Sequence, residues 1–235
     1  MGISSIRWWV ASALAITALQ AAALSPGMAD TFESGADGGW SAGPASVAPP
    51  SVVSSGGPSG AGDGYLVLTA LGGAGASSRL TAIAGPQWAG DYLSAGVDRI
   101  SMDLKNLGSS TLNLRLWLAG PLGASALSFE AVTLATGSNW TAISFSLAPG
   151  ALSGQALAVL ADVQQLRLFH GTSAGFPGEP IVAALGVDNV SAVPEPATAW
   201  LLLAGLATAG ALRRRRPGCS SPPLAHGPHF ASRRP

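Results

Sequence analysis

The sequence predicts an all-β fold, a β-sandwich of the jelly-roll type, for most of the chain. Short segments alternate apolar and polar residues with a period of two, as in residues 111–118, and Gly, Pro, Asn and Ser separate them. These segments recur about every 10–20 residues, with almost no helical periodicity between them. Apolar residues make up 48% of the 235 residues and charged residues only 10%, a composition that excludes a disordered acidic or basic protein.

The predicted strands fall between residues 30 and 192. The clearest candidates span residues 100–105, 111–118 and 143–147, each with apolar side chains on one face and mostly polar ones on the other. Weaker candidates are residues 65–69, 79–84, 127–134, 163–169 and 181–190. Residues 154–165 show a helical pattern that is long enough for one or two turns. Residues 42–63 are rich in Gly, Ser, Pro and Ala, which predicts a long flexible loop within this single domain.

The first 29 residues have the pattern of a secretory signal peptide. Arg7 precedes a long apolar stretch, and small residues follow it. Gly27 and Ala29 place small side chains at the two positions that signal peptidase requires, so we predict cleavage after Ala29. The three alanines at 21–23 are the second choice. An N-terminal membrane anchor is the alternative, but Pro26 would break its helix.

The C-terminal segment 193–216 combines three features in a fixed order. Pro194, Glu195 and Pro196 come first, and two prolines around one Glu predict an extended, accessible hinge. The apolar residues 197–212 follow; as a helix they would span about 24 Å, a little less than the ~30 Å hydrocarbon core of a membrane. An arginine cluster then places the far end on the cytoplasmic side: Arg213, Arg214, Arg215 and Arg216. Residues 217–235 have the composition of a disordered tail.

The order and spacing of these features resemble the PEP-CTERM sorting signal of Gram-negative bacteria. In that family the signal directs exported proteins to exosortase, a membrane protease that is thought to cut near the motif, in species associated with extracellular polysaccharide and biofilms. The resemblance implies an exported protein that is held transiently in the inner membrane by a transmembrane helix and then reaches the cell surface or extracellular matrix. The alternative is an ordinary single-span tail anchor. Family members usually end soon after the arginine cluster, whereas this chain continues to Pro235.

The charge of the chain is unevenly distributed. The formal net charge is zero, but residues 30–192 hold eleven acidic and five basic side chains, a net charge of −6, and both ends are basic. Basic ends suit an anionic membrane surface. An acidic body repels nucleic acid, whose binding rests on Lys and Arg at the phosphates. We therefore predict no nucleic-acid partner.

Alternation places polar and aromatic side chains together on one face of two predicted strands. These side chains are Asn113, Arg115 and Trp117 in the first strand and Arg167 and Phe169 in the second. Sugars bind to aromatic faces and to planar polar side chains, so the two rows would form a glycan-binding surface if the strands are neighbours. The alternative is an ordinary solvated face with weak cross-strand charge pairs.

A second pair of aromatic residues lies in a predicted loop. Trp88 and Tyr92 are close in sequence, next to Pro86. They are candidates for a second aromatic platform for a sugar ring. The alternative is that both side chains anchor the loop to the core.

Short motifs near the two ends of the domain resemble the first and last strands of carbohydrate-binding jelly rolls. The motifs are residues 30–33, 38–40 and 186–190. Those modules often pair a Glu or Asp near the start with an Asp in the closing strand around a structural calcium ion, a hard cation that prefers carboxylate and carbonyl oxygens. The resemblance implies calcium ligands at Glu33 and Asp188, with Asp30 in reserve. The alternative is that both carboxylates are solvated or cap local structure.

The sequence contains no residue set that specifies a reaction. Glycoside cleavage needs two facing carboxylates about 5–10 Å apart, and nothing pairs candidates such as Asp103 and Glu130. His170 is the only His of residues 30–192, and no nucleophile elbow or phosphate-binding loop is present. We predict a non-catalytic surface or matrix protein that binds exopolysaccharide. The alternative is a hydrolase or lyase that acts on extracellular polysaccharide.

Overall fold

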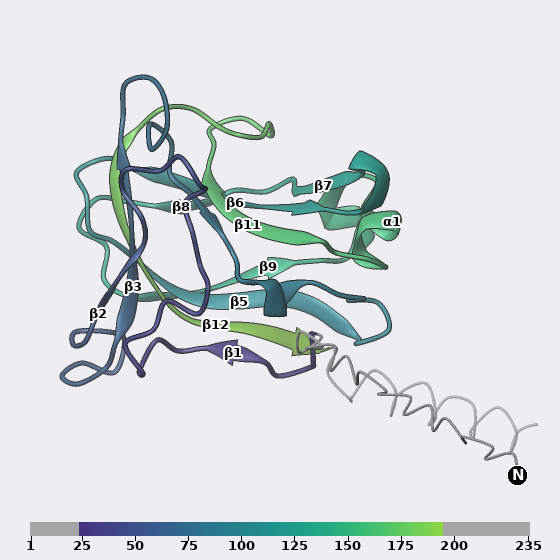
Figure 1. Cartoon of the computed structure of the whole chain (residues 1–235), viewed down its shortest axis with the longest axis horizontal. Coiled ribbons are helices and arrows are strands. Elements are labelled where there is room, and N and C mark those ends of the chain that lie inside the picture. The colour runs from purple at the N-terminus through teal and green to yellow at the C-terminus, as the bar shows by residue number, and fades with distance from the viewer. Residues whose placement is uncertain (1–23, 195–235) are drawn as a thin grey trace, which may run out of the picture. The chain divides into compact units, whose positions relative to one another are not determined.

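Two antiparallel sheets form a β-sandwich in the computed structural model, which describes residues 24–194 of the chain. Each sheet has six strands. Figure 1 shows β6, β7 and β11 in one layer and β5, β9 and β12 in the other, with α1 at one end of the sandwich. The expected all-β sandwich is confirmed. The expected signal and transmembrane helices lie outside the described residues.

Sheet A contains the first and last described strands. Its order is β2-β3-β12-β5-β9, and β1 pairs with β12 beyond the end of β3. The bounds are β1 Ala29–Asp30, β2 Ser51–Val53, β3 Tyr65–Leu71, β5 Val97–Asn106, β9 Thr141–Ser146 and β12 Val182–Pro194. The longest strand, β12, therefore occupies the centre of the sheet, between β3 and β5.

Sheet B is built from the middle of the chain. Its order is β10-β7-β6-β11-β4. Strand β7 pairs with the C-terminal end of β6, and β8 pairs with the N-terminal end of β6. The bounds are β4 Thr81–Ile83, β6 Leu112–Ala119, β7 Ser125–Ser128, β8 Val132–Leu134, β10 Leu152–Gly154 and β11 Gln165–His170. Within residues 24–194, the one α-helix, α1, spans Ala156–Leu160, and 3-10 turns cover Pro86–Trp88, Pro121–Gly123 and Pro149–Ala151.

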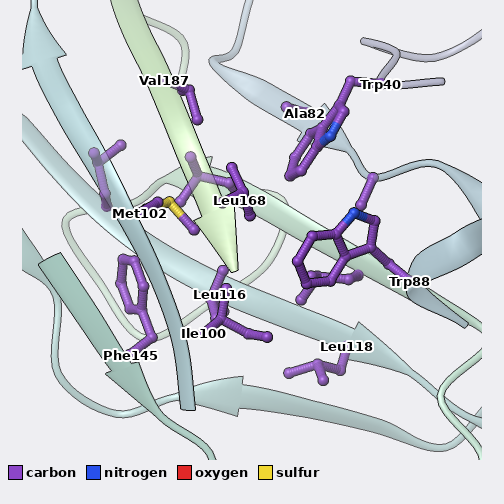
Figure 2. Packing of buried hydrophobic residues seen from close by; sticks show 14 of the residues in the cluster. Trp40, Ala82, Trp88, Ile100, Met102, Leu116, Leu118, Phe145, Leu168 and Val187 are labelled. Carbon is purple, nitrogen blue, oxygen red and sulfur yellow. The ribbon is translucent and has the colours of Figure 1, made fainter. Parts of the chain in front are cut away.

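The core lies between the inner faces of the two sheets. Alternate residues of each strand point inward, so β5 contributes Ile100 and Met102 and β6 contributes Leu116. Figure 2 shows these side chains packed together with Leu168 and Val187, with the indoles of Trp40 and Trp88 nearby. Because this apolar surface is buried only when the sheets stack, the alternation seen in the sequence commits the chain to a sandwich.

Three sequence-based boundaries differ from the structure. The predicted strand at 127–134 is two strands, β7 and β8, which pair with different parts of β6. The predicted flexible loop at 42–63 contains β2, which pairs with β3. The helical pattern at 154–165 yields only the five residues of α1. In each case a tertiary partner, rather than local pattern, sets where the element begins and ends.

The two ends of the described chain lie side by side on sheet A. Ala29 pairs with Ser191, and the Gly27 N–H donates to Ala192 O at 2.8 Å. Leu24 is buried in the core at 8% exposure. The predicted cleavage after Ala29 thus falls within β1. Pro194, predicted to begin a hinge, is instead the last residue of β12.

Candidate functional site

The outer face of sheet B gathers the residues predicted to bind glycan. Strands β6 and β11 are neighbours, so Trp117 lies opposite Arg167 and Arg115 lies opposite Phe169. Asn113 lies on the same face, where its Oδ1 accepts from Thr133 Oγ1 at 2.9 Å. The two rows inferred from alternation therefore meet, because the register between β6 and β11 brings them together.

Two of these five residues are covered by the chain that follows β11. Residues 171–181, here called the 171–181 loop, run back across the outer face of sheet B. Phe169 has 0% exposure, and Arg115 has 7%. The Arg115 guanidinium donates to the carbonyls of Gly171 (3.1 Å), Ser128 (3.0 Å) and Phe129. The prediction that Arg115 and Phe169 touch a ligand is therefore wrong, because both side chains hold the loop and β7 in place.

Three partly exposed side chains form an aromatic cluster at the edge of that loop. The rings of Trp117 and Phe176 are stacked, with centroids 4.5 Å apart and an interplanar angle of 19°. The Arg167 guanidinium carbon lies 5.1 Å from the centroid of each ring, within the range of cation–π attraction. Trp117, Arg167 and Phe176 are hereafter the aromatic cluster; Trp117 and Arg167 belong to the predicted face, and both are partly exposed. Phe176 was not predicted, since its loop has no periodicity and only the fold places it on Trp117.

A hollow of about 400 Å³ opens beside the aromatic cluster. Trp117 and Phe176 line it on one side, and Ser125, Ser153 and Gly175 supply hydroxyl and backbone groups on the others. Its lining includes no acidic or histidine side chain among the residues that the structure describes. Flat aromatic faces beside a few polar groups suit the mixed C–H and hydroxyl surface of a sugar.

The 171–181 loop is fixed at both ends by polar contacts. Glu179 accepts hydrogen bonds from the Thr172 N–H at 2.9 Å and the Thr172 hydroxyl at 2.7 Å. These two bonds lower the pKa of Glu179 to about 2, and the bond from the Thr172 N–H has the larger effect. Arg79 Nε donates to Gly178 O at 2.8 Å. Gly178 has a φ of +77°, and a Cβ there would lie 1.9 Å from His170 O. The loop backbone is therefore closely seated, which fixes the position of Phe176.

His170 is held within sheet B. It is buried at 4% exposure, and its Nδ1 accepts from the Asn113 N–H at 3.0 Å. Burial lowers the pKa of His170, and the nearby Glu179 charge opposes that change. An imidazole whose Nδ1 is committed to backbone bonding between β6 and β11 acts as part of the sheet.

Trp88 and Tyr92 do not form a platform. Both have 0% exposure. The Tyr92 hydroxyl donates to Trp88 O at 2.8 Å, and burial raises the pKa of Tyr92 above its ordinary value. The prediction of a second aromatic platform at these residues is wrong, and the alternative of loop anchors is correct.

Asp30 is engaged with those anchors. Its Oδ2 accepts from the indole N–H of Trp40 at 2.7 Å and of Trp88 at 2.8 Å. Gln87 Nε2 adds a third donor at 3.2 Å. A carboxylate with these donors joins β1 to the buried tryptophans. Asp30 therefore serves the core, whereas the sequence suggested it as a reserve metal ligand.

The outer face of sheet A carries a group of carboxylates around Asp188. Asp188 has 0% exposure, its Oδ1 accepts from the Asn189 N–H at 2.7 Å, and its Oδ2 has no hydrogen-bond partner. Burial raises the pKa of Asp188 to about 6, and the charges of Asp63, Glu33 and Asp103 add to this effect against the Asn189 bond. These four residues are hereafter the carboxylate cluster.

The carboxylate cluster lacks a cationic partner in the part of the chain that the structure describes. The one ion pair there joins Arg99 to Asp98. Glu33 accepts from the Gly64 N–H at 3.3 Å, and Asp63 accepts from the Ser59 N–H. Hydrogen bonding with Ser59 and, to a smaller extent, with Glu33 lowers the pKa of Asp63. Within residues 24–194, no three His, Cys, Asp or Glu side chains stand in a ready metal-binding arrangement.

A second aromatic pair lies on the outer face of sheet A, where sequence reasoning did not place one. Tyr65 and Trp140 meet edge to face with centroids 5.1 Å apart. A Cβ at Gly186 would lie 2.9 Å from the Trp140 ring, so glycine lets the ring approach β12. Trp140 Nε1 donates to Gly56 O at 2.9 Å. This pair holds the segment before β3 against the sheet.

The sorting motif begins where the described structure ends. Pro194 pairs with Val97 at the end of β12. Glu195, Pro196 and the arginines at 213–216 lie outside the described residues, as do the predicted signal peptide and tail. Among residues 24–194, no helix has the length and apolar character needed to cross a membrane.

Comparisons with known proteins agree with the sequence and the fold. Residues 192–216 match the PEP-CTERM protein-sorting motif. The motif implies export, sorting to the cell surface and processing by exosortase, a membrane protein. A comparison with curated protein sequences finds no significant match.

The sandwich is similar to domains of known structure. An exo-beta-agarase matches with a TM-score of 0.53 and 13% identity over 73% of this chain and 26% of the agarase. The family 11 carbohydrate-binding module of a cellulosomal cellulase of Clostridium thermocellum matches with a TM-score of 0.48 and 12% identity, over 74% of this chain and 97% of the module. The chain thus spans about a quarter of the length of the agarase, and the likeness concerns the fold.

Proposed function

We propose that the sandwich is a non-catalytic glycan-binding domain of an exported surface or matrix protein, and that it binds exopolysaccharide on the outer face of sheet B. The observation that supports this most is the stacked pair of Trp117 and Phe176 beside a hollow with polar groups. An aromatic pair held rigidly by its own loop loses little conformational entropy when a sugar binds, which favours binding.

The same hollow supports binding without cleavage. Glycoside hydrolysis uses two carboxyl groups about 5–10 Å apart on either side of the scissile bond. Among the described residues, no carboxylate lines the hollow beside Trp117. The carboxylate cluster around the buried Asp188 lies instead on the other sheet. A polysaccharide bound at the aromatic cluster would therefore be held and left intact.

The sorting motif defines where this binding would matter. A protein that exosortase processes after export would reach the cell surface or the matrix with its sandwich intact. Binding to exopolysaccharide there would retain the released protein among the secreted polymers. The net charge of −6 in residues 30–192 opposes binding to nucleic acid.

We also propose that the carboxylate cluster holds a structural calcium ion. Calcium prefers carboxylate and carbonyl oxygens, and Asp188 offers a buried Oδ2 that has no partner. Glu33 and Asp63 would supply further oxygens from the segments before β2 and β3. A bound cation would neutralise charges that otherwise raise the pKa of Asp188, and it would join those segments to β12.

Substitution of Trp117 tests the glycan-binding proposal. We expect Trp117→Ala to weaken binding of the exported protein on a glycan array by tenfold or more, because a stacking surface is lost. The matched control is Trp140→Ala on sheet A, which removes an indole from the opposite face and should leave glycan binding unchanged. Equal binding by Trp117→Ala and the unsubstituted protein, with both folded by circular dichroism, would sink the proposal.

A further inference from the structure

The aromatic cluster on sheet B includes one charged side chain, Arg167. Its Nε donates to Gln165 Oε1 at 2.6 Å, which orients the guanidinium beside the rings of Trp117 and Phe176. In the part of the chain that the structure describes, Nε is the only guanidinium atom of Arg167 with a protein acceptor. No carboxylate of those residues comes within 4.0 Å of it. The two terminal nitrogens therefore keep their capacity to donate to a ligand.

The surroundings of Arg167 make this cation unusual in the domain. Residues 30–192 carry a net charge of −6, yet the lining of the neighbouring hollow contains no acidic side chain. Arg115, on the adjacent strand, donates hydrogen bonds to three backbone carbonyls. Arg99 is paired with Asp98, and Arg79, like Arg167, donates through Nε alone, in its case to Gly178 O. Among residues 24–194, Arg167 is thus the arginine whose guanidinium lies against the rings of Trp117 and Phe176 while its terminal nitrogens lack a protein acceptor.

A guanidinium in this setting is suited to an anion. It is held rigidly by Gln165 and two aromatic rings, and its planar donors match the oxygens of a carboxylate or a sulfate. A neutral sugar hydroxyl would form weaker hydrogen bonds with it than a charged oxygen would. The aromatic rings meanwhile give the sugar ring a stacking surface within reach of the charge.

Resting on the proposed function, we propose that the glycan recognised by the aromatic cluster is an anionic polysaccharide whose carboxylate or sulfate group is bound by Arg167. Trp117 and Phe176 stack against the sugar, and the Arg167 guanidinium selects the charged residue of the polymer. The negative charge of the rest of the domain opposes nonspecific attachment of polyanions, so selection depends on this one contact.

Affinity electrophoresis of the exported protein tests the inference with two matched pairs of polymers. Polygalacturonate and its methyl ester differ in a carboxylate charge, and dextran sulfate and dextran differ in sulfate groups. We expect retardation by the charged member of at least one pair with a dissociation constant about tenfold lower than for its neutral partner. The pair that shows the difference identifies the charged group.

Two substitutions separate a local contact from overall charge. Arg167→Gln should reduce retardation by the charged polymer to the level of the neutral one. Lys105→Gln is the matched control, since it removes the same charge from the outer face of sheet A and should leave retardation unchanged. Equal retardation by neutral and charged polymers, or an unaffected Arg167→Gln variant, overturns the inference. If neutral polymers bind equally and Trp117→Ala abolishes that binding, the proposed function stands. Failure of every polymer to retard the protein overturns both.

Discussion

The outer faces of the two sheets use the same alternation of side chains for opposite purposes. On sheet B, the 171–181 loop places Phe176 on Trp117, and Arg167 lies beside both rings. On sheet A, the segments before β2 and β3 cover the centre of β12 and bury Asp188 among other carboxylates. Among residues 24–194, one face thus presents a cation without a carboxylate partner, and the other holds carboxylates without a cationic partner. The difference shows that covering loops, more than strand patterns, decide what a sandwich face can bind.

Removal of calcium is the largest expected perturbation, and it acts on sheet A. If the carboxylate cluster holds calcium, calcium at a thousand times its dissociation constant should raise the free energy of unfolding by about 4 kcal/mol. A chelator that removes the calcium should abolish this stabilisation. Thermal unfolding in calcium and in EDTA measures this effect. Glycan binding on sheet B should be retained below the lowered melting temperature.

Asp188→Asn tests the calcium proposal further, because its effect on stability should have opposite signs with and without calcium. A pKa of about 6 in place of 3.8 means that the metal-free folded protein binds a proton more tightly than the unfolded chain. Its stability therefore falls as the pH rises through about 6, by up to about 3 kcal/mol at pH 7. Asp188→Asn should be stabilising in EDTA and destabilising in calcium, whereas the exposed control Asp162→Asn should change neither. Identical melting curves with and without calcium would remove the proposed ion.

Arg115→Ala is the next largest perturbation, and it acts on sheet B. The substitution leaves the carbonyls of Gly171, Ser128 and Phe129 without their buried donor, so we expect a loss of about 3 kcal/mol of stability. Urea unfolding followed by tryptophan fluorescence measures it. Arg99→Ala, which breaks a partly exposed, solvent-screened ion pair, should cost far less stability. Comparable losses in the two variants would contradict the role assigned to Arg115.

The smallest expected effect concerns the anchoring of the 171–181 loop. Glu179→Gln weakens the bonds to Thr172 at an exposed site, so global stability should change by well under ~1 kcal/mol while glycan affinity falls a few-fold as Phe176 loosens. Because its folded pKa is lowered from 4.5 to about 2, Glu179 stabilises the loop above pH 4.5, and that contribution is lost as the pH falls toward 2. A Phe176 signal that stays unchanged from pH 6 to pH 2 in fluorine NMR of labelled protein would exclude this anchor.

Strand patterns show how much of the site could be predicted from sequence. The alternation in 111–118 correctly placed Trp117 and Arg115 on one face, and the register between β6 and β11 joined them to Arg167. Alternation predicts which face of the sheet a side chain points to, but it does not predict whether another segment covers that side chain. Arg115 and Trp117 were therefore predicted to be equally accessible. Phe176 escaped notice because a loop rich in Gly, Ser and Pro has no period to interpret. Trp88 and Tyr92 were misjudged because loop aromatics in sequence look the same whether they face solvent or core.

By itself, the sequence determined the all-β class, the identity of most strands and the sorting motif at residues 192–216. These properties depend on local order: a period of two, turn residues between strands, and a fixed succession of prolines, apolar residues and arginines. Only the tertiary structure decided that Arg115 and Phe169 are covered, that the terminal nitrogens of Arg167 lack a protein acceptor among residues 24–194, and that the Oδ2 of Asp188 is buried without a hydrogen-bond partner. Burial and charge pairing depend on which distant segments cross a face, and that information lies in long-range packing of the whole domain.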